Sequence, residues 1–224
     1  MNNFKVFIGK KICVEIPGQI HTRGLLVDTG TDLIVLFNGK DFIYIPNAHI
    51  HLLYLDEENY ESIEFPEELP LETESDTLSV RKILNNSKGM FSEIVVANDQ
   101  AIHGYVTNIM NDYFVFYSPV FHTMYISLQH LKWLIPYRSN QVPYALERAT
   151  FTSYPSTLSL ARSLDAQIKK MFGNIVIFDL GENVRKIGQL RSFQNNMLEL
   201  VTAREEVTYV NARHVKSVHI PNKG

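Results

Sequence analysis

The sequence predicts a mainly β chain of three tandem, small, five-stranded SH3/Sm-like barrels, with a short helix before the second and third. Two observations lead to this prediction. The first is a threefold repeat of about 80 residues, anchored on Gly24, Gly104 and Gly188. The second is the pattern inside each repeat, where short runs of β-forming residues alternate with turn residues. A repeat of this size indicates tandem structural modules.

The repeat is defined by residues at fixed distances from its anchor glycine. A second glycine lies 15 residues before each anchor, and a turn residue, a tyrosine and a histidine follow it. In the order of the three repeats, these positions are Gly9, Gly89 and Gly173; Asp32, Asp112 and Asn196; Tyr44, Tyr125 and Tyr209; and His49, His130 and His214. Glycine, aspartate and asparagine suit turns. We therefore interpret the repeated positions as structural.

The strands follow from local patterns. Lys11 to Ile16 alternates polar and apolar residues, which is typical of a half-buried strand, and Asn38-Gly39 is a hairpin signal. Five strands fit each repeat without room for crossover helices, so the sheet must be antiparallel and strongly bent. The expected strands are 11–16, 24–27, 33–37, 42–46 and 49–53; 91–96, 104–106, 113–117, 124–126 and 130–134; and 175–180, 188–190, 197–201, 207–210 and 214–220.

Helical patterns precede the second and third repeats. Asp76 and Ser156 are the expected N-caps, because serine and aspartate accept hydrogen bonds from the first helical turn. The apolar residues that recur at helical spacing before the third repeat are Leu160, Leu164, Ile168 and Phe172.

These patterns divide the chain into three modules and two linkers. The expected ranges are barrel 1 over 1–56, an acidic linker over 57–75, a helix with barrel 2 over 76–136, a linker over 137–155, and a helix with barrel 3 over 156–224.

Composition excludes several classes of protein. Ten acidic residues and no Lys or Arg lie between Asp56 and Asp76, which indicates a solvated linker. The single cysteine, Cys13, excludes an intrachain disulfide and a cysteine-based zinc site. The first residues show no secretory pattern, and no apolar run reaches the ~20 residues that span a bilayer. We therefore expect a protein made in the cytoplasm, with no membrane partner and no cofactor.

One loop resembles the active-site loop of aspartic peptidases. Asp28-Thr29-Gly30 follows an apolar run, and two such carboxylates must share a proton in those enzymes. One copy per chain would require a homodimer. The aligned loops of the other repeats keep only turn character, so a peptidase is a remote alternative and we expect no catalytic residue.

The histidines give a second candidate site. His49 and His51 alternate by two and share one face of a strand, as a metal pair would. Lys132 and Lys216 replace His51 in the other repeats. We therefore expect no metal, and interpret the repeated histidine as a half-buried ring that binds the backbone.

Ligand binding is an open alternative. Basic residues are too sparse and scattered for the usual nucleic-acid surface, although Sm-like barrels include RNA binders. A small ligand, such as a nucleotide signal, would bind where barrels meet. Arg23, His103 and Lys186 are the candidate ligand residues, because they precede or flank the anchor glycines.

The repeat resembles the Sm-like module found in tandem in the amino-terminal half of the spore coat protein B family. The matching segments are Gly24 to Val27, Asp32, Tyr44-Ile45 and His49-Ile50 in the first repeat, and Gly188 to Asn196, Tyr209-Val210 and His214 to Val218 in the third. The family's Ser- and Lys-rich tail has no counterpart here. The resemblance implies a three-barrel scaffold from a spore-forming bacterium, without surface display or phosphorylation.

We therefore expect a non-enzymatic structural or assembly protein that is incorporated into the spore coat. Its expected partners are other coat or scaffold proteins, including further copies of itself. The alternative is an Sm-like module that sequesters a small ligand or RNA.

Overall fold

The computed structural model describes residues 3–18, 20–57, 63–66, 70–71, 78–97, 100–138, 141, 143–145 and 159–221. Most of the two expected linkers, and the expected caps Asp76 and Ser156, lie outside these residues. The chain forms two compact units: Met1–Val106 with Leu131–Ala145, and Thr107–His130 with Leu146–Gly224. None of the described helices is long and apolar enough to cross a membrane.

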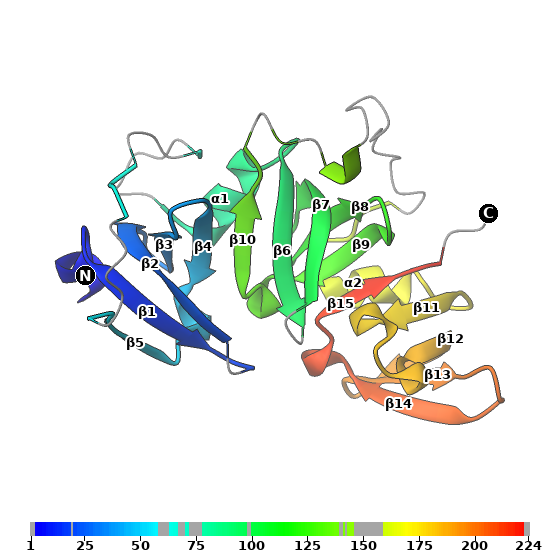
Figure 1. Cartoon of the computed structure of the whole chain (residues 1–224). Coiled ribbons are helices and arrows are strands. Elements are labelled where there is room, and N and C mark those ends of the chain that lie inside the picture. Colours follow the sequence, from blue (N-terminus) through cyan, green and yellow to red (C-terminus); the bar gives the residue numbers. More distant parts are fainter. Residues whose placement is uncertain are drawn as a thin grey trace. The chain divides into compact units, whose positions relative to one another are not determined.

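The first unit contains the first repeat and part of the second (Figure 1). Its strands are β1 (Lys11–Ile16), β2 (Ile20–Thr29), β3 (Leu33–Phe37), β4 (Phe42–Pro46), β5 (Leu52–Leu55), β6 (Phe91–Ala97), most of β7 (Gln100–Ile109) and β10 (Trp133–Pro136). Its helical elements are the 3-10 turns η1 (Asn3–Phe7), η2 (Asn47–His49) and η5 (Pro143–Ala145) and the helix α1 (Val80–Asn86).

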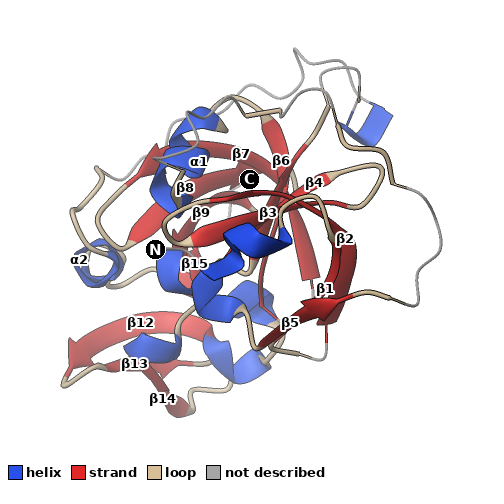
Figure 2. Ribbon diagram, turned by 90° about the vertical axis from the view of Figure 1, so that its left-hand side faces the viewer, coloured by secondary structure: helices blue, strands red, loops and turns tan. Residues whose placement is uncertain are grey.

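The second unit contains the rest of the second repeat and the third. Its further strands are β8 (Tyr113–Ser118), β9 (His122–Ser127), β11 (Ile175–Phe178), β12 (Ile187–Gln194), β13 (Met197–Val201), β14 (Val207–Asn211) and β15 (Ser217–His219). Its helical elements are α2 (Leu164–Lys169) and the 3-10 turns η4 (Leu128–His130), η7 (Asp179–Gly181), η8 (Val184–Lys186) and η9 (Ala212–His214). Figure 2 shows that strands predominate over short helical turns.

The prediction of a mainly β chain is confirmed. The fifteen named strands form one open antiparallel sheet in the order β14-β13-β12-β11-β15-β9-β8-β7-β6-β10-β4-β3-β2-β1-β5. Closed barrels, which the sequence predicted, are not detected among the described residues. The reason is that the fifth strands of the second and third repeats, β10 and β15, pair on their other edge with β4 and β9 of the preceding repeat.

Each repeat nevertheless has the same internal strand order. Its fifth strand lies beside its first, followed by the second, third and fourth strands. The register is also the same, because the repeated tyrosine lies opposite the third residue of the third strand each time. These pairs are Val35 with Tyr44, Val115 with Tyr125, and Glu199 with Tyr209.

The anchor glycine allows two strands to approach closely. A Cβ atom at Gly24 would lie 2.7 Å from the carbonyl oxygen of Phe37, and one at Gly188 would lie 2.5 Å from that of Val201. No side chain fits at these distances. The periodic glycine of the sequence therefore marks a packing constraint on the second strand.

The N-caps of the two helices are Ser79 and Ser163, three and seven residues after the expected caps. The Ser79 hydroxyl accepts a hydrogen bond from the backbone of Lys82 at 3.3 Å, and the Ser163 hydroxyl accepts one from Ala166 at 3.3 Å. Serine is a favoured N-cap because it satisfies an N–H group that the helix leaves open. The two short helices thus use the same start signal in both repeats.

Two hydrophobic cores include residues from a neighbouring repeat. In the first unit, Trp133 and Ile135 of β10 pack against the core of the first repeat. In the second unit, Tyr113, Val115 and Tyr125 of the second repeat belong to the core of the third. The first and third repeats therefore complete their cores with residues of the second repeat.

The third repeat replaces a backbone acceptor by a buried carboxylate. In the first repeat, the N–H of His51 donates to the carbonyl of Glu15 at 2.8 Å, at the start of the fifth strand. At the same place in the third repeat, Oδ1 of Asp179 accepts hydrogen bonds from the N–H groups of Lys216 at 2.7 Å and Ser217 at 3.2 Å. Asp179 has a φ of +49°, so its own backbone has left the strand.

We expect the substitution Asp179→Ala to lower the free energy of unfolding by about 2–4 kcal/mol, because it leaves two N–H groups and the Lys186 ammonium without their acceptor. The Lys186 Nζ lies 2.5 Å from Asp179 Oδ2. Asp179→Asn keeps an acceptor oxygen and should cost less. Glu206→Ala, at an exposed carboxylate, is the matched control. Urea titration followed by circular dichroism measures the difference, and parental stability of Asp179→Ala would contradict the role of this carboxylate.

Candidate functional site

The recurrent contact of the structure is a junction between the edges of successive repeats. We call the pairing of β4 with β10 the first junction and the pairing of β9 with β15 the second junction. Tyr44 lies opposite Leu134 in the first junction, and Tyr125 lies opposite Val218 in the second. Leu134 and Val218 both follow the repeated histidine by four residues. The two junctions therefore share one register.

The second junction is longer than the first, with three residue pairs against one. The N–H of Ser127 donates to the carbonyl of Lys216 at 2.9 Å. In the first junction, Pro46 stands at the position of Ser127 and has no N–H group to donate. Tyr44 and Tyr125 are each 3% exposed, so both junctions bury the repeated tyrosine.

The repeated aspartate connects a turn to the helix of the next repeat. Oδ1 of Asp32 accepts a hydrogen bond from the backbone of Val80 at 2.9 Å, and Oδ1 of Asp112 accepts one from Leu164 at 2.8 Å. Val80 and Leu164 are the first residues of α1 and α2. A carboxylate beside a helix N-terminus also interacts favourably with its open N–H groups.

Sequence reasoning assigned Asp32 and Asp112 to turns and missed this contact. A signal was present, because the residue is aspartate in the two repeats that a helix follows and Asn196 in the third. Asn196 instead lies in a left-handed turn, with a φ of +62°, between β12 and β13.

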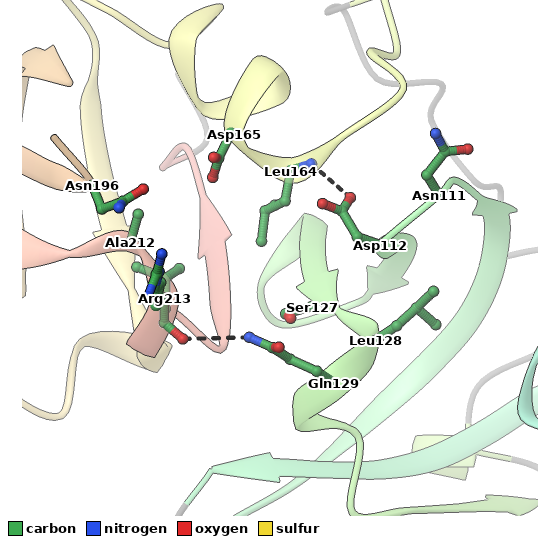
Figure 3. A pocket seen from close by; sticks show the side chains of 11 residues that line it. Asn111, Asp112, Ser127, Leu128, Gln129, Leu164, Asp165, Asn196, Ala212 and Arg213 are labelled. Carbon is green, nitrogen blue, oxygen red and sulfur yellow. Dashed lines mark hydrogen bonds between the residues drawn. The ribbon is translucent and has the colours of Figure 1, made fainter. Parts of the chain in front are cut away.

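A cavity of about 300 Å³ lies at the second junction (Figure 3). Charged groups enter it from both repeats, namely Asp112, Asp165 and Arg213. Nε2 of Gln129 donates to the carbonyl of Arg213 at 3.3 Å and crosses the junction at the edge of the cavity. The residues that line it are Asn111, Asp112, Ser127, Leu128, Gln129, Leu164, Asp165, Asn196, Ala212, Arg213 and Val215.

The repeated histidines lie in different environments. Nε2 of His130 is 3.4 Å from the carbonyl oxygen of Arg213, and burial is the largest cause that lowers the pKa of this imidazole. His49 is half-buried and His214 is exposed. His51, the second member of the candidate metal pair, is exposed as well. Within the described ranges, no group of three or more His, Cys, Asp or Glu side chains is arranged to hold a metal ion.

The candidate ligand residues do not line the cavity. Nη1 of Arg23 lies 3.7 Å from Oδ1 of Asp56. Nδ1 of His103 lies 3.0 Å from the hydroxyl of Tyr137, and Lys186 pairs with Asp179 as described above. Each of the three side chains thus contacts another side chain of the protein. Their role in binding a ligand stays a prediction.

Asp28 and Thr29 are the last residues of β2 and lie opposite Val35 and Ile34 of β3, so the loop that the sequence predicted here is part of a strand. Oδ1 of Asp28 accepts a hydrogen bond from the N–H of Thr29 at 2.7 Å, and burial raises the pKa of Asp28 above its ordinary value. A Cβ atom at Gly30 would lie 2.2 Å from the carbonyl oxygen of Leu78. Because glycine has no side chain, the segment before α1 can pack closely against position 30.

Comparison with known proteins finds a relative over nearly the whole chain and a family model over part of it. Residues 163–218 match the family model described as the YwrJ third domain. This range begins at the N-cap of α2 and ends within β15. The chain is 39% identical over 225 residues to a protein of Bacillus subtilis (strain 168) named Uncharacterized protein YwrJ, covering 99% of this chain and 100% of the relative. These comparisons contain no link to spore coat protein B, so that resemblance stays a hypothesis.

We expect Asp112→Ala to lower the free energy of unfolding by about 1 kcal/mol, the usual cost of losing a cap of this kind. Asp112→Asn keeps a side-chain acceptor, like Asn196 in the third repeat, and should retain most of the stability. Chemical denaturation of the three proteins measures the effect. Equal losses in the alanine and asparagine variants would show that charge, and not the hydrogen bond to Leu164, carries the contact.

Proposed function

The chain belongs to the YwrJ family, and we propose that it is a non-enzymatic assembly protein of the spore-coat type. The observation that carries the proposal is the repeated junction, in which strand edges join and core residues pass from one repeat to the next. The five strands of each repeat have the same order, as tandem copies of one module would. This order supports the resemblance to the modules of spore coat protein B.

The distribution of the repeated residues also supports an assembly role. Tyr44 and Tyr125 are buried in junctions, and Asp32 and Asp112 bind the helix of the following repeat. The residues that suggested chemistry, such as Asp28, occur in one repeat only. The recurring positions of the first two repeats therefore make contacts between modules, whereas the residue that suggested chemistry does not recur.

The proposal predicts that the protein is made late in sporulation and is extracted from purified spores. Immunodetection in a spore-forming host such as Bacillus subtilis, with the gene under its own promoter, measures both properties. A cytoplasmic protein of similar size controls for carry-over into the spore extract. Presence in growing cells together with absence from spores would overturn the coat role.

The cavity at the second junction favours one alternative, the sequestration of a small ligand such as a nucleotide, or of RNA. Arg213 and Asp165 supply opposite charges at this cavity, so a polar ligand would find both a cation and an acceptor. RNA would require a longer basic surface than this cavity provides.

Thermal denaturation with a panel of nucleotides tests this alternative. A ligand at a hundredfold excess over its Kd would stabilise the protein by about 2.7 kcal/mol. Arg213→Ala should abolish the shift, whereas Arg204→Ala, at an exposed turn, should retain it. No shift with any nucleotide would remove nucleotides as ligands of this cavity.

A further inference from the structure

Two strand edges of the described sheet have no neighbouring strand. The strand order ends at β5 on one side and at β14 on the other. β5 is the fifth strand of the first repeat, and β14 is the fourth strand of the third. Strands of these two kinds pair with each other at both internal junctions, so the two terminal edges are the complementary halves of a third junction.

The two edges expose apolar side chains that are less exposed at the equivalent places of the internal junctions. Tyr209 is 63% exposed, whereas Tyr44 and Tyr125 are 3% exposed. Leu52 is 51% exposed, and its counterpart in the second repeat, Trp133, packs against the core of the first repeat. The other exposed apolar residues on these strands are Tyr54, Leu55 and Val207.

We propose that a second copy of the chain covers these edges, with β14 of one copy paired antiparallel to β5 of the next. The register of the internal junctions places Tyr209 opposite Leu53, because Leu53 follows His49 by four residues, as Leu134 and Val218 follow their histidines. The proposal deepens the assembly role proposed above, since it names the partner and the two strands.

The backbone of both edges suits this pairing. Ser127 donates its N–H to Lys216 across the second junction, and the equivalent residues at the third are Asn211 and His51. In a strand, alternate residues direct their N–H and C=O groups to the same edge. Tyr209 and Asn211 therefore present hydrogen-bonding groups to the open side of β14, and an open edge of this kind is a template for another strand.

The side chains would interlock as they do inside the chain. Trp133 and Ile135 of β10 pack against the core of the preceding repeat; Leu52 and Tyr54 hold the same positions on β5. Tyr125 belongs to the core of the following repeat, and Tyr209 is its counterpart. Each copy would thus bury residues of the other.

Charge favours the orientation. Residues 56–76, directly after β5, contain ten acidic residues and no Lys or Arg. The third repeat, residues 156–224, contains ten Lys and Arg against six Asp and Glu. Segments of opposite net charge attract each other, so added salt should weaken the association.

The third junction is more polar than the internal ones. Glu199 occupies the place of Val35 and Val115 beside the repeated tyrosine, and its carboxylate accepts a hydrogen bond from the Ser192 hydroxyl at 2.8 Å. We therefore expect a reversible association that depends on protein concentration. Because the two edges differ, the contact is head-to-tail and produces closed rings or open filaments.

The test measures the mass of the purified full-length chain by analytical ultracentrifugation over a range of concentrations. The mass of the parent should increase with concentration. Tyr209→Lys and Leu52→Lys should each raise the dissociation constant about 10- to 100-fold, because both place a charge in an apolar contact. Val120→Lys is the matched control, since Val120 is 59% exposed and lies in the turn between β8 and β9. Circular dichroism checks that each variant is folded.

Mixing the two variants distinguishes the head-to-tail contact from a symmetric one. Tyr209→Lys retains an intact β5 and Leu52→Lys retains an intact β14, so the mixture should form dimers that grow no further. A parent that stays monomeric at every concentration would overturn the proposal, and so would association that neither variant weakens or a mixture that forms no dimer. The experiment uses purified protein, whereas the coat role is tested in spores, so one proposal can fail without the other.

Discussion

The pairing of strand edges between successive repeats is the contact on which the rest of the structure depends. A repeat of five short strands leaves backbone groups open along its fourth and fifth strands, and an open edge of this kind templates pairing with another strand. Here β10 covers the edge of β4, and β15 covers the edge of β9. The same pairing places Tyr125 in the core of the third repeat. The same residue therefore takes part in the strand pairing and in the hydrophobic core.

The turn aspartates add a second connection to each junction. Asp32 and Asp112 bind the first N–H of α1 and α2, so the helix of one repeat starts on the turn of the repeat before it. The third repeat makes a further substitution, since Asp179 supplies a carboxylate where the other repeats supply a backbone carbonyl. Carboxylate side chains thus accept the backbone N–H groups at these helix and strand starts.

The candidate sites show where sequence reasoning stops. Arg23, His103 and Lys186 occupy related positions in the repeat, and position alone suggested a shared surface. In the structure, Asp56, Tyr137 and Asp179 partner them separately. The cavity at the second junction is lined partly by repeated positions, Asp112 and Asn196, and partly by residues of other segments, such as Asp165. A cavity depends on which segments pack together, and local patterns do not contain that information.

The amino-acid sequence by itself determined the β class, the threefold repeat, and the presence of a short helix before the second and third repeats. It did so because glycine, turn residues and alternating apolar residues act locally, as Gly24 and Asn38-Gly39 illustrate. Only the tertiary structure decided that β10 and β15 join neighbouring repeats in an open sheet instead of closing barrels. The physical reason is that a strand edge carries the same donors and acceptors whichever strand it meets, so its partner is chosen by packing over long distances in the chain.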